Sequence, residues 1–556
     1  MWQQNYEPLG GSLGLSALVA AIPIFVLVYM LGIRRSASWQ AALAALGSAI
    51  LISLVAYGMP AQLALISAVY GAAFGLFPIA WIVFTSILLY RIVVDTGKFE
   101  VIKDSVGGLT NDRRLQALFI AFSFGAFIEG AAGFGAPVAV SGAMLAGLGF
   151  NPFYAAGICL LANTAPVAFG SIGIPVVTLA NVTGLPLLPL SAMVGRLCAI
   201  VSIFIPGYLL VVMVGWKRAL EVWPAIVACG VSFAGVQFYV SNYMGPELTD
   251  ILSSLTCIVV MVAVLKLWKP RTTMRLEGEQ PVTTAPKEHP AAELFMAWMP
   301  YLLLVVFVLA WGEPAIKASL DRFTDSLLPP HTGLNGLAVP GLHNVITRMP
   351  PVTAQPSPYA AVFTLNWLSA SGTSCLFAAI LASIFLGVRP KQFAGAYQAT
   401  FKQLAYPMLT IASMLALAYV MNYSGMTTTL GLALAATGWA FPFFSATLGW
   451  LGVFLTGSDT SSNALFGNLQ VVTANALGLS PILTASVNTA AGVMGKMISV
   501  HSIAVAVAAT GMSRDDESRL FRFTIKHSVL LMAVMGVISM LYAYVFNDYV
   551  PALPPK

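Results

Sequence analysis

A short polar segment with the residue types needed for binding lies inside a long apolar region of the sequence. It spans residues 456–463 (TGSDTSSN) and consists of polar residues and glycine. A membrane interior offers no water to such groups, so they persist there only where they are buried in protein or line a cavity. The ionisable residue in this setting, Asp459, therefore indicates a functional site. Similar polar breaks recur near residues 130, 163 and 488, which favours a shared cavity over a surface loop between two spans.

The composition is that of a polytopic membrane protein. Of 556 residues, 58% are hydrophobic and only 9% are charged, against roughly 25% charged in soluble domains. A net charge of +6 would suggest a nucleic-acid partner for a soluble protein. Here the positive charges follow the ends of apolar runs, as expected of cytoplasmic loops, so we expect a lipid bilayer and no nucleic acid as partner. All five cysteines lie in apolar stretches without metal-ligand spacing, so neither a metal nor a cofactor is expected.

Apolar runs of about 20 residues, long enough to span a membrane, predict an all-α fold with about 12 transmembrane helices. Basic residues at Arg34–Arg35, Arg113–Arg114 and Lys217–Arg218 place those ends in the cytoplasm and both termini outside. The predicted spans are residues 13–33, 39–57, 71–94 (after an interfacial start at residue 60), 152–182, 190–216, 222–240, 251–268, 294–311, 368–388, 404–422, 481–510 and 529–546.

Two further apolar runs are interrupted in the middle. Residues 115–149 are broken at 129–137 (EGAAGFGAP), and residues 443–478 are broken at the opening octet. Glycine and proline break helices, so each run predicts a re-entrant hairpin with its tip at the break. The span 152–182 is broken at 163–166 (NTAP), and 481–510 is expected to break near Asn488. In transporters, the exposed ends of such discontinuous helices bind substrates and ions.

The hairpins and broken helices recur as an internal repeat. Residues 124–130 (FGAFIEG) match 451–457 (LGVFLTG), and 148–152 (LGFNP) match 477–481 (LGLSP). Asn163, Thr164 and Gly170 likewise match Asn488, Thr489 and Gly495. The three matches occur in one order at nearly one offset. An odd number of predicted spans separates the hairpins, so the repeats should be inverted, as in secondary transporters.

The repeat divides the chain into a predicted scaffold and a predicted transport domain. The scaffold comprises residues 1–95 and 293–422, the second part with a long external loop at 312–358. The transport domain comprises 96–187 and 423–511, each a hairpin followed by a broken helix. The remaining parts are connecting spans at 188–268, a cytoplasmic linker at 269–292, and an amphipathic segment with the last span at 512–556.

At these residues the chain strongly resembles the L-lactate permease family, bacterial proton symporters of lactate and glycolate. The matching stretches are 2–6 (WQQNY), 129–138 (EGAAGFGAPV), 162–170 (ANTAPVAFG), 241–248 (SNYMGPEL), 452–466 (GVFLTGSDTSSNALF) and 495–499 (GKMIS). After Ser499 the family usually reads Pro-Gln-Ser, whereas this chain has 500–502 (VHS), a departure that bears on coupling or substrate preference.

The resemblance implies import of L-lactate, with D-lactate and glycolate as further substrates, by proton symport across the bacterial inner membrane. The plan of two hairpins and two broken helices is also similar to the wider ion-transporter superfamily, which implies an elevator-type mechanism.

A 2-hydroxy monocarboxylate needs a cation or a helix N-terminus, together with neutral hydrogen-bond donors. Lys496 is the best cation candidate, because a lysine in a span costs about 2.5–3.5 kcal/mol and calls for a partner or a ligand. The alternative is a permanent structural bridge from Lys496 to Asp459. The other predicted substrate-binding residues are Ser458, Thr460, Ser461, Ser462, Asn463, Gly130, Gly133, Asn163, Thr164, Asn488, Thr489 and Arg196. Each polar residue of this set could equally cap a half-helix.

Proton coupling needs a carboxylate or histidine able to titrate in the working pH range. Glu129 and Asp459, near the two hairpin tips, are the main candidates, and His501 is a third whose alternative role is that of a satisfied core residue. A sodium-coupled carboxylate transporter is the alternative function. An intramembrane enzyme is disfavoured, since no His-Glu-x-x-His pattern and no suitably placed Gly-x-Ser-x-Gly elbow occurs, and two hairpins suited to occlusion disfavour a passive channel.

Overall fold

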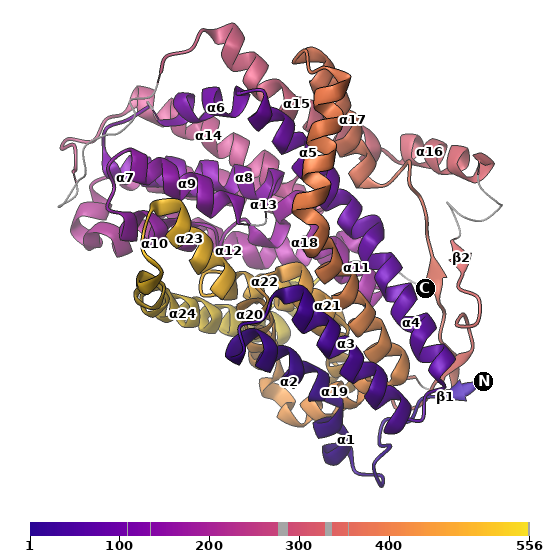
Figure 1. The fold of residues 1–556 in the computed structure, drawn as a ribbon. Coiled ribbons are helices and arrows are strands. Elements are labelled where there is room, and N and C mark those ends of the chain that lie inside the picture. The colour runs from indigo at the N-terminus through magenta and orange to yellow at the C-terminus, as the bar shows by residue number, and fades with distance from the viewer. Residues whose placement is uncertain (108, 134, 276–286, 328–335, 354, 554–556) are drawn as a thin grey trace.

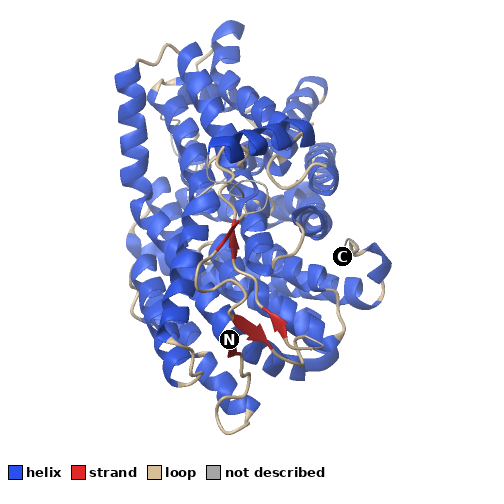
Figure 2. Cartoon of the chain, turned by 90° about the vertical axis from the view of Figure 1, so that its right-hand side faces the viewer, coloured by secondary structure: helices blue, strands red, loops and turns tan. Residues whose placement is uncertain are grey.

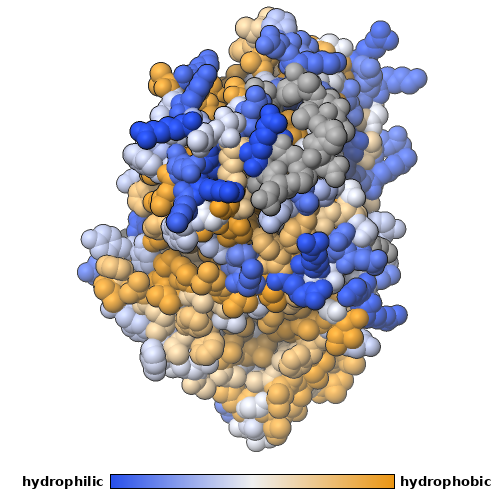
Figure 3. All heavy atoms as spheres, turned by 90° about the vertical axis from the view of Figure 1, so that its left-hand side faces the viewer, coloured by the Kyte–Doolittle hydropathy of each residue, from blue (hydrophilic) through white to orange (hydrophobic). Residues whose placement is uncertain are grey.

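The computed structural model describes residues 1–107, 109–133, 135–275, 287–327, 336–353 and 355–553. These residues are almost all helical (Figure 1). Within them, 12 helices are long and apolar enough to cross a membrane. The predicted class, a nearly all-helical polytopic membrane protein with about 12 spans, is thereby confirmed. Figure 3 shows the matching surface, with apolar side chains over much of the lower part of that face and polar ones gathered above.

The first part of the chain forms one long kinked rod after two shorter spans. Helices α1 (Leu13–Ala20) and α2 (Ile22–Val28) form the first span with the π-helical turn η1 (Tyr29–Ile33), and α3 (Ser38–Val55) forms the second. Helix α4 (Ala61–Phe74) then continues through η2 (Gly75–Ala80) into α5 (Trp81–Asp95) as one apolar stretch.

The predicted interfacial start at residue 60 is joined to the predicted crossing, because α4 belongs to the same candidate span. Its course is fixed by close packing against the long helix α18 (Pro390–Ser424). A Cβ at Gly71 would lie 2.5 Å from the Leu415 carbonyl oxygen, and one at Gly75 would lie 2.7 Å from the Ala412 Cα.

The first interrupted run is helical on both sides of its break. After α6 (Lys98–Gly107), the segments α7 (Arg113–Gln116), η3 (Ala117–Phe124) and α8 (Gly125–Ala131) run together, and α9 (Ala136–Gly147) follows. Gly133 and Gly135 turn the chain between α8 and α9 with φ of +63° and +85°, a region that favours glycine.

The next predicted break is also present. Helices α10 (Pro152–Ala162) and α11 (Gly170–Thr183), joined through the 3-10 turn η4 (Val167–Phe169), are bent by 62° around residues 163–166. Asn151 caps α10 by accepting a hydrogen bond from the Phe153 amide.

Three long helices and a mixed segment connect the two halves. Helices α12 (Leu187–Leu220), α13 (Trp223–Tyr243) and α14 (Thr249–Leu267) pack side by side, and α15 (Ala291–Gly312), α17 (Ser371–Phe385) and α18 follow. The predicted span 368–388 corresponds to α17, a shorter apolar helix that is not among the 12 candidate spans.

The predicted external loop 312–358 contains regular structure of its own. It carries α16 (Pro314–Leu327) and short strands (Figure 2). Strand β3 (Ile346–Arg348) pairs with β4 (Ser357–Pro358) and, in parallel, with β1 (Trp2–Gln3) at the N-terminus. A second pair joins β2 (Leu337–Ala338) and β5 (Val362–Phe363). The N-terminal residues and this loop therefore lie on the same side of the molecule.

The last part of the chain carries the octet between two helices. Helix α19 (Met426–Leu434) and the 3-10 segment η5 (Ala435–Ala440), which the sequence did not predict, precede α20 (Phe441–Thr456) and α21 (Asp459–Leu477). The chain continues through α22 (Pro481–Lys496), α23 (Val500–Thr510), η6 (Arg514–Asp516) and α24 (Glu517–Tyr544) to a last turn, η7 (Asn547–Tyr549).

The break predicted near Asn488 is wrong, because this residue lies inside α22 and the helix ends at Lys496. Asn488 and Thr489 each donate a hydrogen bond of 2.9 Å to the Asn463 Oδ1 atom, so their side chains are satisfied without interrupting the backbone. The break lies at residues 497–499 instead, where the Ser499 hydroxyl accepts from the Ser502 amide and caps α23.

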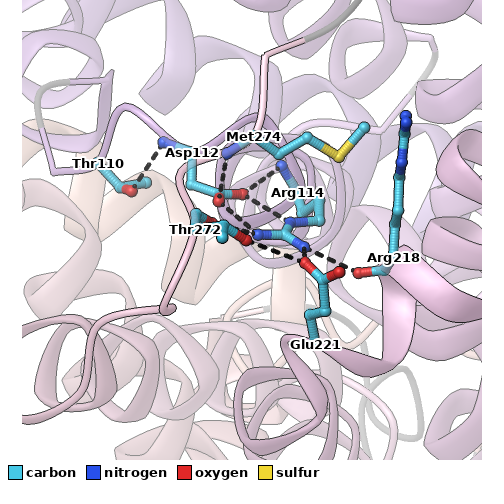
Figure 4. A network of polar contacts seen from close by, with 7 residues as sticks. All are labelled: Thr110, Asp112, Arg114, Arg218, Glu221, Thr272 and Met274. Atoms are coloured by element: carbon cyan, nitrogen blue, oxygen red, sulfur yellow. Dashed lines mark hydrogen bonds and ion pairs between the residues drawn. The ribbon is translucent and has the colours of Figure 1, made fainter.

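A buried arginine ties the start of α7 to the end of α12 (Figure 4). Arg114 donates to both carboxylate oxygens of Asp112 at 3.1 and 2.8 Å and to Glu221 at 2.7 Å. It also donates to the carbonyls of Arg218 and Thr272. Hydrogen bonds hold the pKa of Glu221 below its usual value, mainly the one from Arg114 and to a smaller extent the one from Thr272. This network fixes three segments that are distant in sequence.

Candidate functional site

A cavity of about 370 Å³ lies where the helix breaks meet. One wall comes from the start of α3 and the middle of α18. The other wall comes from the C-terminal ends of α8, α20 and α22 and from the N-terminal ends of α9, α11, α21 and α23. The lining residues are Ala37, Ser38, Trp39, Glu129, Gly135, Val167, Gly170, Ser171, Ile174, Pro175, Tyr406, Pro407, Thr410, Ile411, Thr456, Gly457, Ser458, Asp459, Thr460, Ser461, Lys496 and His501.

Lys496 forms an ion pair with Glu129 in this cavity. It is the last residue of α22, and its Nζ atom lies 2.8 Å from the Glu129 Oε1 atom. The side chains are 12% and 3% exposed. The backbone leaves little space around the carboxylate, since a Cβ at Gly170 would lie 2.5 Å from Oε1. The predicted lysine pair thus exists, but its acidic partner is Glu129 and not Asp459.

The octet places Asp459 at the start of a helix that faces the cavity. Helix α20 ends at Thr456, Gly457 turns the chain with φ of +72°, and the Ser458 hydroxyl caps α21 by accepting from the Ser461 amide. Asp459 is the first residue of α21 and is 3% exposed, and neither of its carboxylate oxygens has a hydrogen-bond partner among the described residues. The N-terminus of α21 adds backbone amides and a partial positive charge, which together suit an anion.

His501 lies between the two helix breaks. A Cβ at Gly135, just before α9, would lie 3.6 Å from its Nε2 atom, and one at Gly457 would lie 3.3 Å from its Cβ. The side chain is exposed in the cavity. The alternative of a core histidine is therefore wrong, because the Ser499 cap starts α23 so that His501 in its first turn faces the cavity.

Several predicted binding residues brace the helices instead of lining the cavity. Ser462 donates to the Gly449 carbonyl at 3.2 Å. The Asn463 amide donates to the Pro175 carbonyl at 3.0 Å, and its oxygen accepts from Asn488 and Thr489. The hydrogen bonds of Asn463 join α11, α21 and α22 behind the cavity wall, and that of Ser462 joins α21 to α20. Their hydrogen-bonding groups are used within the protein.

Other predicted residues are not among those that line the cavity. Asn163 and Thr164 border a small void on the far side of Lys496. Gly130 and Gly133 give room to neighbours, because a Cβ would lie 2.8 Å from the Asp250 Cβ at the first and 2.0 Å from the Ser171 hydroxyl at the second. Arg196 donates to Asn242 at 2.8 Å and to the Tyr549 carbonyl. The prediction of Arg196 as a substrate contact therefore finds no support in its position, since a partner near the C-terminus holds it away from the cavity.

Sequence reasoning missed two sets of residues. The wall formed by Trp39, Tyr406 and Thr410 has no polar break that could mark it. Asp250, in the first turn of α14, is 1% exposed, and neither carboxylate oxygen has a hydrogen-bond partner among the described residues. Its position directly before an apolar run suggested a span boundary. Among the described residues, no group of three or more His, Cys, Asp or Glu side chains is arranged to hold a metal ion.

Comparison with known proteins adds the following. A family model described as L-lactate permease matches residues 16–546. The chain is 50% identical to an L-lactate permease of Bacillus subtilis (strain 168), an alignment that covers 99% of this chain and 100% of that protein. It is 47% identical to the glycolate permease GlcA of Escherichia coli (strain K12), covering 98% and 99%. Among solved structures, the Alcanivorax borkumensis YdaH transporter aligns with a TM-score of 0.46 and 15% identity, covering 89% of this chain and 90% of that one. That likeness is below the level at which a shared fold follows.

Proposed function

This chain belongs to the L-lactate permease family, and we propose that it carries lactate and glycolate across the bacterial inner membrane by proton symport. The names of its relatives, L-lactate permease and glycolate permease, support the substrate class. The 12 apolar helices support a multi-pass membrane protein. The Lys496–Glu129 ion pair in the cavity carries the proton-coupling part of the proposal.

The ion pair links substrate binding to proton binding through charge balance. Lys496 is neutralised by Glu129 at 2.8 Å. When a substrate carboxylate takes the lysine, Glu129 is left as an unpaired anion in a buried site, which is strongly unfavourable unless it takes up a proton. One carboxylate and one proton therefore bind together, and the loaded cavity keeps the charge of the empty one.

The octet supplies the remaining contacts for a 2-hydroxy acid. Ser458, Thr460 and Ser461 line the cavity beside Lys496, and their hydroxyl groups can donate to or accept from the substrate hydroxyl. The N-terminus of α21 favours the carboxylate. We assign Asp459 and His501, which line the same space, as further proton-coupling groups.

We also propose the elevator arrangement, with a scaffold formed by residues 1–95 and 293–422 and a transport domain formed by 96–187 and 423–511. The cavity lining supports this division, because all lining residues on one wall (Ala37–Trp39 and Tyr406–Ile411) belong to the proposed scaffold and all others to the proposed transport domain. A second structure, solved with substrate accessible from the opposite side, should show the transport parts displaced against α3 and α18 as one body.

The inverted repeat remains part of this proposal. Helices α10 and α22 each begin with proline, at Pro152 and Pro481, after a capping side chain, Asn151 or Ser480. The two helices therefore begin with the same pattern, a capping side chain followed by proline. The re-entrant course of α8–α9 and of α20–α21, and the placement of both termini outside, belong to the same proposal. Single cysteines near Trp2 and Arg34, labelled from either side of oriented vesicles, should react from opposite sides.

Transport in proteoliposomes tests the function. We expect an inward proton gradient to drive lactate accumulation, sodium to have no effect, and a proton ionophore to abolish it. Glu129→Gln, which mimics the protonated state, should make uptake insensitive to the proton gradient. Glu100→Gln makes the same change beside Lys103 on the exposed part of α6 and serves as the control. Accumulation that requires sodium and ignores the ionophore would favour the sodium-coupled alternative and end this proposal.

A further inference from the structure

A third buried carboxylate lies beside the ion pair, on a helix outside the proposed transport segments. We propose that Asp250 of α14 is a further proton-binding site, which holds a proton while Glu129 is ionised and passes it to Glu129 when the substrate takes Lys496. This inference rests on the proposed proton symport and names a residue that the binding cavity itself does not include.

Asp250 is built into the contact between α14 and the end of α8. A Cβ at Gly130, the residue after Glu129, would lie 2.8 Å from the Asp250 Cβ. The segment just before α14 also packs against α11, where a Cβ at Gly173 would lie 2.7 Å from the Pro246 carbonyl carbon. Both glycines lie next to cavity-lining segments, so Asp250 is held against the backbone that carries Glu129.

The Asp250 carboxyl group is buried without a donor. It is 1% exposed, and neither oxygen has a hydrogen-bond partner among the described residues. The nearby hydroxyls donate elsewhere: Thr249 to the Gly245 carbonyl at 2.9 Å, Ser254 to the Ile251 carbonyl at 3.0 Å, and Ser253 to the Thr249 carbonyl. The N-terminus of α14 compensates a negative charge only in part. A buried carboxylate in this setting is neutralised by taking up a proton.

The charged and titratable groups that face Asp250 come from three neighbouring helices. Glu129 of α8 and Lys496 of α22 are within electrostatic reach of it, and Cys198 of α12 is within reach of both Asp250 and Asp459. Lys496 is the one cation of this group, and it is committed to Glu129 at 2.8 Å. One lysine neutralises one carboxylate, so charge balance leaves Asp250 and Asp459 protonated while Glu129 is ionised.

The transfer is balanced in protons and charge. When a substrate carboxylate binds Lys496, the O–H bond of Asp250 breaks and an O–H bond forms at Glu129. Asp250 then takes a replacement proton from water on the side from which substrate entered. When the substrate leaves on the other side, Lys496 returns to Glu129, whose proton is released there. Each cycle moves one substrate anion and one proton in the same direction.

Asp250→Asn in the full-length protein, reconstituted in proteoliposomes, tests this role. Lactate accumulation driven by a proton gradient should fall by about 100-fold, the lower end of the effect of removing a positioned proton carrier. Exchange of internal for external lactate at equal pH should fall much less, because it needs no net proton delivery. Asp321→Asn makes the same change at a buried aspartate of α16 whose carboxylate accepts from Ser369, and it should alter neither activity.

A second measurement reports on protonation directly. Infrared difference spectra of the wild-type protein at neutral pH should contain the C=O band of a protonated carboxyl group that disappears in Asp250→Asn and persists in Asp321→Asn. Asp250→Ser, which is smaller, replaces the asparagine variant if that one does not fold.

The outcomes separate the two proposals. Wild-type accumulation that ignores the proton gradient overturns the proposed function and this inference with it. If proton-driven accumulation by the wild type is as expected, three results with folded Asp250 variants would overturn only the Asp250 inference. These are normal lactate accumulation, an equal loss of accumulation and exchange, and the persistence of every protonated-carboxyl band. A loss of lactate accumulation in the Asp250 variants that depends on sodium would show that the Asp250 carboxylate binds a cation, and would likewise overturn the Asp250 inference.

Discussion

Two groups of buried charged side chains, around Arg114 and around Lys496, are satisfied to different extents. Around Arg114, all three guanidinium nitrogens donate to carboxylates or carbonyls, and Asp112 accepts further hydrogen bonds from the amides of Arg114 and Met274 (Figure 4). Around Lys496, one hydrogen bond joins the lysine to Glu129. The carboxylate oxygens of Asp459 and Asp250 and the Oε2 atom of Glu129 have no hydrogen-bond partners among the described residues.

The difference separates a structural network from the one proposed to be functional. Buried charges stabilise a fold only when good geometry and further hydrogen bonds offset the loss of water, and the Arg114 network meets this condition. The Lys496 group does not, and it borders a cavity. Locally unsatisfied groups of this kind are expected where a ligand or proton completes them.

Removing Arg114 should have the largest effect on folding. Arg114→Ala leaves Asp112 buried without its cation, a loss of about 3–5 kcal/mol, so little folded protein should survive detergent extraction. The yield and melting temperature of the monodisperse peak in size-exclusion chromatography measure this. Arg218→Ala is the control, because only the Arg218 backbone carbonyl joins the network and its side chain points away (Figure 4). A stable Arg114→Ala protein would contradict the structural role.

Removing Lys496 should instead abolish binding and spare the fold. Losing one side of a desolvated charge pair costs about 2–5 kcal/mol, or roughly 30-fold to several thousand-fold in lactate affinity. Glu129 can then take up a proton, so the protein should remain monodisperse. Lys496→Arg keeps the charge with a different reach and should be partly active. Lactate affinity is read from thermal shift or calorimetric titration.

A double variant separates substrate binding from bridging. If Lys496 only bridges Glu129, Lys496→Ala combined with Glu129→Gln should recover both stability and lactate affinity. If Lys496 binds the substrate, the double variant should be stable and unable to bind lactate. Near-normal affinity would rule out the substrate-binding role.

Asp459→Asn should have a smaller effect than Arg114→Ala or Lys496→Ala. The substitution keeps the shape and removes a carboxylate that has no hydrogen-bond partner among the described residues. The melting temperature should therefore stay the same or rise, and the free energy of unfolding should change by no more than about 1 kcal/mol. Proton-driven lactate uptake should fall in the same variant. A lower melting temperature with unchanged uptake would make Asp459 a structural residue like Asp112.

The smallest effect is expected at His289, where two partly exposed carboxylates face one imidazole. Asp104 and Glu293 accept from its ring nitrogens at 2.9 and 3.0 Å. These hydrogen bonds raise the pKa of His289 above its usual value, and the one to Asp104 contributes most. A raised folded-state pKa stabilises the protein fully at pH values below the unfolded pKa of about 6.5, and this stabilisation is lost as the pH rises through the raised pKa.

The pH dependence of the melting temperature tests this contact between α6 and the start of α15. His289→Gln should lower the melting temperature slightly at about pH 6 and leave it unchanged well above the raised pKa. An equal decrease at both pH values would assign His289 a packing role.

The sequence predicted much of the fold because its signals are local. Apolar runs set most helices to within a few residues, since a span must satisfy its own backbone in lipid. The breaks within 129–137, at 163–166 and within 456–463 were predictable from glycine, proline and clustered polar residues, although α8 continues to Ala131 and α21 already begins at Asp459. The break at Asn488 was wrong because a polar side chain interrupts a helix only when it finds no partner elsewhere, and Asn463 supplies that partner.

What the sequence by itself determined is the family, the membrane class and the identity of the charged residues near the cavity, because hydropathy and motifs are properties of contiguous segments. Only the tertiary structure decided that Lys496 pairs with Glu129, that Asp250 joins them, that Arg196 lies elsewhere, and that α3 and α18 close the cavity. These facts depend on which helices pack together, and the choice of partner for a buried charge is made by distance and desolvation across residues far apart in the chain.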